Sequence, residues 1–274
     1  MATVAGNYTV RERLPDQLSG TPRAHSIDRW IFVAMAVWYI AIVLTGFLPD
    51  SFMKVGMVQA GKRPPFPPIL HVHAVLMGSF LLLLLAQATM MATGRCEQHK
   101  RVGIVAFLFV PALVIAGLLV APAIYHQVAH AAVAGPPAVR GVMAQRQSEL
   151  DNILAMQMSV GVMFPLFMAI GLRARAGNSG LHKRMMFLAT AVPLAAAFAR
   201  IQWLPRTLPA SPVSSELYIV AAVMPMFLWD VFRNRRVHEA YWIWLAVYVP
   251  ISVLIALVWD KPWWHATARS IMGV

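Results

Sequence analysis

The stretch ILHVHAVLMGSFLLLLLAQATMMATGRCEQHKR, residues 69–101, decides the fold of this chain. Its first part, Ile69–Ala92, contains no Lys, Arg, Asp or Glu and is long enough to cross a hydrocarbon core of about 30 Å as one helix. The second part, Gly94–Arg101, is polar and basic and holds a histidine. The stretch therefore predicts a membrane-spanning helix that ends in a basic turn.

Composition extends this prediction to the whole chain. Hydrophobic residues make up 59% of the 274 residues and charged residues 12%, whereas soluble domains are nearer half and a quarter. We therefore expect an all-α polytopic membrane protein with seven transmembrane helices. The predicted spans are Trp30–Leu48, Ile69–Ala92, Val102–Ile124, Ile153–Leu172, Met185–Leu204, Leu217–Phe232 and Ala240–Trp259.

The basic turn recurs along the sequence. His99-Lys100-Arg101 precedes the third span, His182-Lys183-Arg184 precedes the fifth, and a looser copy ending in His238 precedes the seventh. These copies divide the bundle into one helix followed by three hairpins. The first two hairpins also share a small-residue-rich second span with a central proline, which indicates an internal duplication, and duplications often create sites at the repeat interface.

The distribution of charge predicts the orientation. With the N-terminus in the cytoplasm, 14 of the 23 Lys and Arg residues lie on the cytoplasmic side, most of them near helix ends. We expect a bacterial inner-membrane protein with a cytoplasmic tail (1–28), a transmembrane domain (29–260) and a periplasmic C-terminal tail (261–274). The net charge of +12 lacks the basic stripe with interleaved aromatics of a nucleic-acid-binding protein, so we expect no such partner.

Two segments have distinctive compositions. The connection Tyr125–Asn152 is too polar and too rich in Ala, Gly and Pro to form a further span, and we expect a loop that folds over the outer mouth. The fifth span carries alanines at 191, 195, 196, 197 and 199, which predicts central packing against neighbouring helices.

Four histidines predict a metal site on the outer side. His126 and His130 are four residues apart and would share one helix face, as two ligands of one ion do. His71 and His73 begin the antiparallel second span and would lie level with them. Possible carboxylate ligands or acceptors on that side are Asp151, Glu216 and Asp260. Interfacial histidines hydrogen-bonded to lipid head groups are the alternative.

The inner side offers a second candidate site, formed by His99, His182 and His238 with Asp230. An ionisable residue at membrane depth is usually functional and paired, so Asp230 is expected to orient a ligating histidine or to pair with Arg233. The alternative is that each basic turn only anchors its helix. At the outer end of span five, Arg200 is expected to bind an anion such as a heme propionate or Asp151, or to extend to head groups.

The run His71-Val72-His73-Ala74-Val75-Leu76-Met77, with Gln87, Gly94-Arg95 and His99–Gly103, resembles an uncharacterised family of bacterial multi-pass membrane proteins. His182–Met186 and Asp230 with His238 match its later segments, so the resemblance covers most of residues 69–240. A fainter similarity is to cytochrome b561-type bundles, in which a His-x-x-x-Met helix entry supplies an axial ligand to heme b. His73–Met77 fits that entry and implies bound heme.

These observations favour a redox protein that transfers electrons across the membrane. The cofactor would be heme b, held by His73 with His126 and by His99 with His182, or an iron, copper or zinc ion. One alternative is a non-enzymatic accessory or assembly subunit of a larger membrane complex, and another is a small-molecule transporter. No nucleophile–base pair or phosphate-binding loop is present in the sequence, so no catalytic residue is predicted and enzymatic activity stays open.

Overall fold

The computed structural model describes residues 16–19 and 25–274, and this part of the chain contains only helices and the loops that join them. In chain order the elements are η1 (Gln17–Ser19), α1 (Ser26–Gln59), α2 (Pro68–Ala92), α3 (Cys96–Gly103), α4 (Ala106–Ala134), α5 (Pro137–Ala174), α6 (Ser179–Ala191), η2 (Val192–Leu194), α7 (Ala195–Phe198), α8 (Val213–Asn234), α9 (Glu239–Val258) and α10 (Pro262–Met272).

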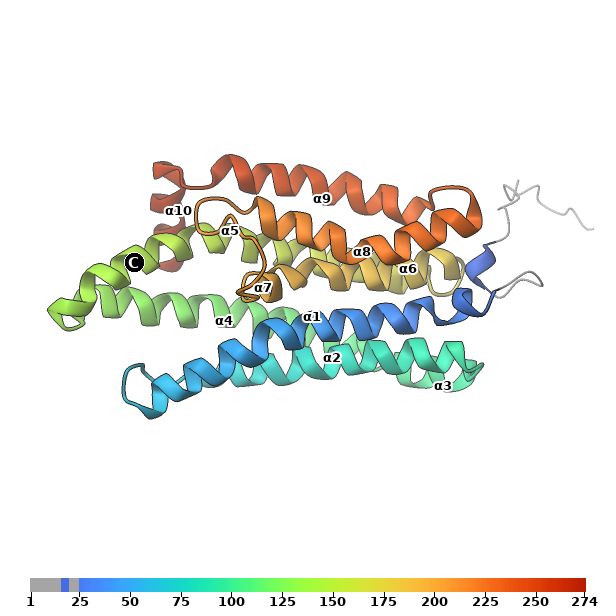
Figure 1. Cartoon of the computed structure of the whole chain (residues 1–274), viewed down its shortest axis with the longest axis horizontal. Coiled ribbons are helices and arrows are strands. Elements are labelled where there is room, and N and C mark those ends of the chain that lie inside the picture. Colours follow the sequence, from blue (N-terminus) through green and yellow to red (C-terminus); the bar gives the residue numbers. More distant parts are fainter. Residues whose placement is uncertain (1–15, 20–24) are drawn as a thin grey trace, which may run out of the picture.

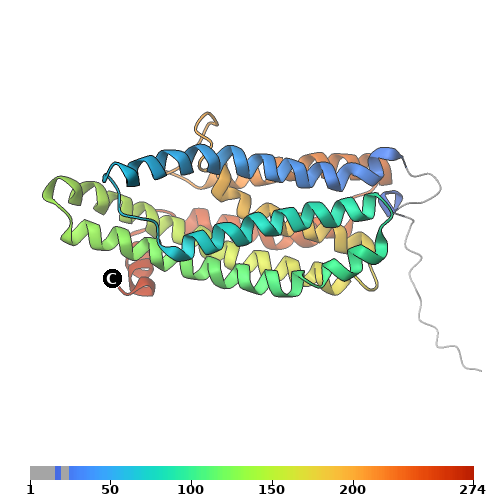
Figure 2. The same cartoon turned by 90° about the horizontal axis from the view of Figure 1, so that it is seen from below.

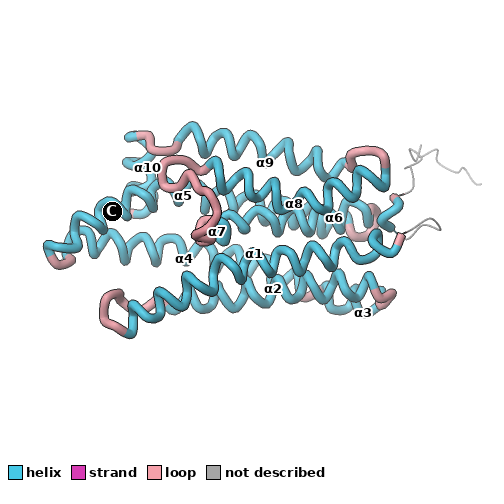
Figure 3. The backbone as a smooth tube through the Cα atoms, viewed as in Figure 1, coloured by secondary structure: helices cyan, strands magenta, loops and turns pink. Residues whose placement is uncertain are grey.

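The long helices lie side by side in one elongated bundle. Successive helices alternate in direction, with the segment of α6 and α7 running opposite to both α5 and α8 (Figure 1, Figure 2). The loops gather at the two ends of the bundle (Figure 3). We call the end at which α1 begins the amino end and the end at which α10 lies the carboxyl end. The turns before α3, α6 and α9 all lie at the amino end, so the three histidine-bearing turns share one end of the molecule.

Six helices of the described chain are long and apolar enough to cross a membrane. In the most apolar stretch of each helix, only 17% to 33% of the stretch is buried inside the protein, so most of the apolar surface of these helices faces outward. Outward apolar surface on long helices is what lipid requires, and the protein is a multi-pass membrane protein in contact with the bilayer. The six helices are α1, α2, α4, α5, α8 and α9.

The predicted fifth span, Met185–Leu204, is interrupted, and the predicted count of seven helices is therefore not confirmed. α6 ends at Ala191, a 3-10 turn follows, and α7 ends at Phe198. Pro193 lies in the 3-10 turn and supplies no backbone donor, which explains why regular α-helix stops there. Residues 199–212 then form an irregular connection to α8.

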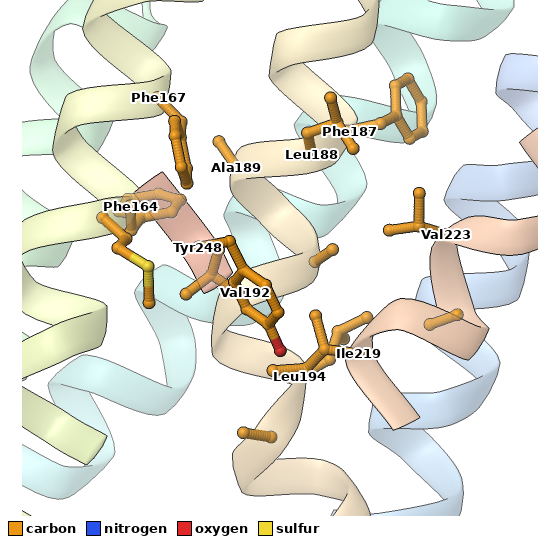
Figure 4. Close-up of a cluster of buried hydrophobic side chains, with 14 of the residues drawn as sticks. Phe164, Phe167, Phe187, Leu188, Ala189, Val192, Leu194, Ile219, Val223 and Tyr248 are labelled. Carbon is orange, nitrogen blue, oxygen red and sulfur yellow. The ribbon is translucent and has the colours of Figure 1, made fainter. Parts of the chain in front are cut away.

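The interrupted segment is the centre of the bundle, as its alanines predicted. From Arg184 to Val192 every residue except Met186 is buried, and α5, α8 and α9 surround it (Figure 4). Phe164 and Phe167 of α5, Ile219 of α8 and Tyr248 of α9 pack around it. On the α1 side, a Cβ added to Gly46 would meet the carbonyl oxygen of Ala197 at 2.4 Å, so only glycine permits this approach of the two backbones.

The predicted outer loop Tyr125–Asn152 is wrong. α4 continues to Ala134 and α5 begins at Pro137, so the segment forms the tip of a helical hairpin that projects beyond the rest of the bundle (Figure 1). Pro136 is the N-cap of α5 and Pro137 is its first residue, a favourable arrangement because the first N–H groups of a helix have no partner within the helix.

Both predicted tails contain ordered structure. Residues 262–272 of the C-terminal tail form α10, which packs across α4 and α5 at the carboxyl end. Of the N-terminal tail, residues 16–19 contribute η1 and residues 26–28 begin α1, while residues 1–15 and 20–24 lie outside the described chain. The assignment of these tails to the cytoplasm and periplasm stays a prediction.

Candidate functional site

Two histidines from different helices meet at the amino end. His99 lies on the short helix α3 and His182 lies on the first turns of α6. Their ring centroids are 6.3 Å apart and their planes are nearly perpendicular, at 80°. Both residues are half-buried. The two occupy equivalent positions in the predicted repeats, and the structure brings them together.

The hydrogen bonds of His182 fix its tautomer. Its Nδ1 lies 2.8 Å from the carbonyl oxygen of Gly171, which can only accept a hydrogen bond. Nδ1 therefore carries the proton, and the lone pair of the neutral ring lies on Nε2. This is the usual arrangement of a histidine that binds metal through Nε2, with its other nitrogen held by the protein.

Gln87 controls the tautomer of His99. With its amide oriented to satisfy every neighbour, Gln87 donates to Nδ1 of His99 at 2.6 Å and to the His99 carbonyl at 3.1 Å, and it accepts from Gly103 N–H at 3.1 Å. The other contact of Nδ1, the carbonyl oxygen of Gln87, is longer at 3.3 Å. In this arrangement His99 carries its proton on Nε2. A half-turn of the amide would let its oxygen accept from Nδ1–H and would move the lone pair to Nε2.

Both imidazoles are held in the neutral form. Burial lowers the pKa of His99, and burial together with the neighbouring His99 and Arg175 lowers the pKa of His182. A neutral imidazole is the form that coordinates a metal ion. At neutral pH, neither ring therefore has to lose a proton to the solvent before it binds an ion.

Met186 is a thioether one helical turn beyond His182. Met186 is four residues beyond His182 on the same face of α6, and its sulfur lies against Gly171, where an added Cβ would approach it to 3.2 Å. His182 and Met186 thus both reach α5 at Gly171. A thioether with imidazoles is a ligand set that suits copper, because soft sulfur ligands favour Cu(I).

The helices that carry the pair pack closely against their neighbours. An added Cβ at Gly171 would meet Met185 and Met186 at 3.2 Å, and one at Gly103 would meet Gln87 at 3.5 Å. The elements on both sides of the rings are therefore in contact. Residues 16–19 and 25–274 contain no group of three or more His, Cys, Asp or Glu around one point, so an ion here would rely on softer or neutral ligands besides the imidazoles.

The four outer histidines are not assembled into one site. His73 faces α4 at Gly117, with 3.6 Å between its Cε1 and an added Cβ, and its buried Nδ1 has no partner among the described residues. His126 lies nine residues beyond Gly117, which is about 13 Å along the helix. One iron or metal ion therefore does not reach both His73 and His126.

The reason is the register in which α2 and α4 pack. Gln127 of α4 donates to the carbonyl of Pro65 at 3.2 Å, so the end of α4 lies beside the loop before α2 and not beside the first turn of α2. His126 and His130 do share a helical face, but both are exposed, and the exposed His71 contacts Phe66 edge-on at 6.1 Å.

Asp230 and His238 serve other contacts than the predicted metal site. Asp230 is fully buried and binds the guanidinium of Arg184, with Nε–Oδ2 2.5 Å and Nη2–Oδ1 2.7 Å. His238 is the N-cap of α9, where its Nδ1 accepts from Ala240 N–H at 3.1 Å. The predicted pairing of Asp230 with Arg233 is also wrong, since Arg233 binds Asp28 at 2.8 Å.

Sequence reasoning missed the buried role of Arg184, which it assigned to orientation alone. Each of the five N–H groups of this fully buried side chain has an acceptor: two on Asp230, two on Asp16 and the carbonyl of Gly180. The network joins η1, α6 and α8 at the amino end. Asp230 was the sequence signal for a buried cation, because a carboxylate inside a membrane span requires a cationic partner.

At the carboxyl end, Arg200 binds Asp50 at 3.3 Å rather than Asp151, and it lies over the ring of Phe47 at 4.5 Å. Asp151 is fully buried and receives hydrogen bonds from Tyr125 of α4, His265 Nδ1 at 3.0 Å and Arg269 Nε at 3.2 Å. This second network, which the sequence did not predict, attaches α10 to the bundle.

Comparison of the chain with protein-family models, with curated proteins and with solved structures finds no match. The resemblance of its motifs to a bacterial membrane-protein family and to cytochrome b561-type bundles stays a prediction.

Proposed function

We propose that this chain is a redox protein of the bacterial inner membrane that binds one copper ion at His99, His182 and Met186. The observation that carries the proposal is the meeting of two neutral imidazoles from equivalent turns of two hairpins. The thioether of Met186, one helical turn beyond His182, favours copper over zinc and over the other predicted metals. Copper would supply one-electron chemistry in exchange with a redox partner.

In the proposed orientation the amino end faces the cytoplasm and the carboxyl end faces the periplasm. The support is the larger share of Lys and Arg near the amino end. The copper ion would then lie near the cytoplasmic interface. A reporter enzyme fused after Val274 should be active only in the periplasm, and activity in the cytoplasm would reverse this assignment.

Binding requires a change at Gln87. With the amide donating to Nδ1, the proton of His99 lies on Nε2. Turning the amide over makes its oxygen the acceptor for Nδ1–H and leaves Nε2 free for the ion, at the cost of the hydrogen bonds that Gln87 forms with the His99 carbonyl and the Gly103 N–H. Groups that hold the second nitrogen of a ligating histidine typically change metal affinity by 10- to 100-fold.

The test is elemental analysis of protein purified from copper-replete cells, with absorption spectra before and after reduction. We expect about one copper per chain in the wild type, and loss of copper in His99→Ala and His182→Ala. The double variant His126→Ala/His130→Ala is the matched control, because it removes two exposed histidines far from the pair. Copper that depends on the control histidines, or a heme spectrum with no copper, would refute the proposal.

One observation favours an accessory role in a larger complex as a second candidate. The tip of the α4–α5 hairpin projects beyond the bundle and exposes apolar side chains, with Val133 77% and Val142 61% exposed. A partner subunit would cover them. Val133→Asp/Val142→Asp should then shift the protein in solubilised membranes to a smaller species on native electrophoresis, and an unchanged size distribution would exclude this role for the tip.

A further inference from the structure

A basic cluster surrounds one carboxylate at the carboxyl end. Asp50 of α1 accepts from Lys54 at 2.6 Å and from Arg200 at 3.3 Å. Arg63 lies near the same carboxylate and near Arg146. Burial and the charge of Arg146 lower the pKa of Arg63, and the charge of Asp50 raises it. Since Arg146 already binds Glu149 at 2.5 Å, Asp50 alone balances the three other cations. The cluster carries net positive charge.

Arg200 can reach a further anion. Its Nε binds Asp50 and its Nη1 donates to the carbonyl of Ala196 at 2.5 Å, while within the described chain Nη2 has no hydrogen-bond partner. Its side chain is 33% exposed and that of Lys54 is 26% exposed. An anion that approaches Asp50 from outside would therefore meet two cationic donors that are already in place.

An apolar groove begins at Arg200. It is an open groove of about 440 Å³ between α1 and the segment that follows α7. Its wall on the α1 side includes Leu44 and Leu48, which are 48% and 47% exposed, and the opposite wall includes Trp203, which is 75% exposed. Among the described residues, Arg200 is the single charged one that lines the groove, and the others are apolar or neutral.

The groove lies at the depth of the lipid head groups. Asp50 is twenty residues beyond Trp30 on α1, which is about 30 Å along the helix and matches one hydrocarbon thickness. α1 continues past Pro49 with Phe52 74% and Met53 49% exposed, so the helix still presents apolar side chains at this level. The cluster is therefore placed at an interface, with the groove directed into the hydrocarbon.

We propose that this groove is a binding site for an anionic phospholipid, with the phosphate on Arg200 and Lys54 and an acyl chain along Leu44 and Leu48. The positive cluster and the apolar groove complement the two parts of such a lipid, and a free phosphate would use only the first. Guanidinium binds phosphate oxygens through paired N–H groups, which suits a site for a fixed head group. The proposal is independent of copper at the opposite end of the bundle.

The test uses delipidated full-length protein in detergent, titrated with phosphatidylglycerol, phosphatidylcholine or inorganic phosphate and followed by native mass spectrometry. We expect one tightly retained phosphatidylglycerol and weaker retention of phosphatidylcholine. Each cation near an anionic lipid contributes about fivefold in affinity. Arg200→Gln and Lys54→Gln should therefore each weaken phosphatidylglycerol binding about fivefold, while the matched control Arg206→Gln in the same loop leaves it unchanged.

A groove variant keeps the test valid if loss of Arg200 disturbs folding. Leu44→Trp leaves the ion pair intact and fills the groove, so it should remove phosphatidylglycerol binding, whereas Asp50→Asn removes the competing carboxylate and should strengthen binding about fivefold. Equal retention of the two lipids, an Arg206→Gln effect as large as that of Arg200→Gln, or undiminished binding by Leu44→Trp would overturn the proposal. Displacement of the lipid by millimolar phosphate would identify the site as one for free phosphate and would also overturn it.

Discussion

Replacing Asp230 by Asn removes one side of the buried ion network at the amino end without changing its shape. Arg184 then keeps its contacts with Asp16 and Gly180, but the two N–H groups that bound Asp230 face a neutral side chain inside the protein. Breaking a buried ion pair from one side typically costs about 3–5 kcal/mol, because the remaining charge stays buried. We expect Asp230→Asn to lower the free energy of unfolding by that amount.

The structure predicts a smaller loss of stability for a second variant, Asp16→Asn. Asp16 also binds Arg184 through two hydrogen bonds, but its side chain is 15% exposed, against 0% for Asp230. Water can therefore partly replace the Asp16 carboxylate, and we expect Asp16→Asn to cost about 1–2 kcal/mol. The double variant Arg184→Met/Asp230→Leu removes both fully buried charges together and should be close to the wild type in stability, because Asp16 keeps Lys183 as its partner at 3.0 Å.

The measurement is reversible unfolding in mixed micelles by titration with sodium dodecyl sulfate, followed by far-ultraviolet circular dichroism. The expected order of stability is wild type and double variant first, then Asp16→Asn, then Asp230→Asn. A double variant as unstable as Asp230→Asn would refute the reasoning, since the loss would then come from packing volume and not from an uncompensated charge. A larger loss for Asp16→Asn than for Asp230→Asn would contradict the role of burial.

Three other predictions concern the histidines and the centre of the bundle. Gln87→Glu gives Nδ1–H of His99 a permanent acceptor and should tighten copper binding about tenfold in a competition titration, whereas unchanged affinity would remove Gln87 from the site. Burial lowers the pKa of His238 to about 4, so stability should be full above about pH 6.5, the pKa of the unfolded state, and fall by about 2 kcal/mol towards pH 4. His238→Asn, which still caps α9, should abolish that dependence in unfolding titrations at several pH values. Gly46→Val should destabilise the protein by about 1–3 kcal/mol because its Cβ meets a backbone oxygen of α7 at 2.4 Å, whereas Gly56→Ala, with no atom within 4 Å, should have little effect in the same titration.

The membrane bundle could be predicted from hydropathy, but the lengths of its helices could not. Hydropathy reports only the part of a helix that lies in lipid. The helix was therefore expected to begin at Ile153, whereas α5 begins at Pro137. The polar residues before Ile153 form helix because α4 and α5 pack against each other along this extension. The prolines at 136 and 137 carried the missing signal, since proline is favoured at the first position of a helix.

The inner histidine pair could be predicted from the repeat, whereas the outer metal site could not be judged from spacing. Spacing shows which residues share a helical face but not the level at which two helices meet. His73 and His126 were placed at one level because their spans are antiparallel neighbours, but His73 meets α4 at Gly117, nine residues before His126. Arg184 was misassigned for a related reason: its partner Asp230 lies 46 residues away, and no local pattern links them.

The two closest copies of the basic turn show which of their residues the fold uses in the same way. Lys100 forms an exposed pair with Glu97, with side chains 69% and 74% exposed, whereas the equivalent Lys183 binds Asp16 with 19% exposure. Arg101 is exposed, whereas Arg184 is completely buried, because α6 is central and α3 is peripheral.

Only the histidine has a similar environment in both copies, although its Nδ1 donates in His182 and accepts in His99. Each ring is half-buried, each has its Nδ1 held by a polar group of the preceding helix, and each faces the other. If the copies were only positive anchors for helix orientation, Lys and Arg would be expected to keep one environment and the histidine to vary. The structure has the opposite pattern, which is the physical ground for seeking the function of this bundle at the histidine pair.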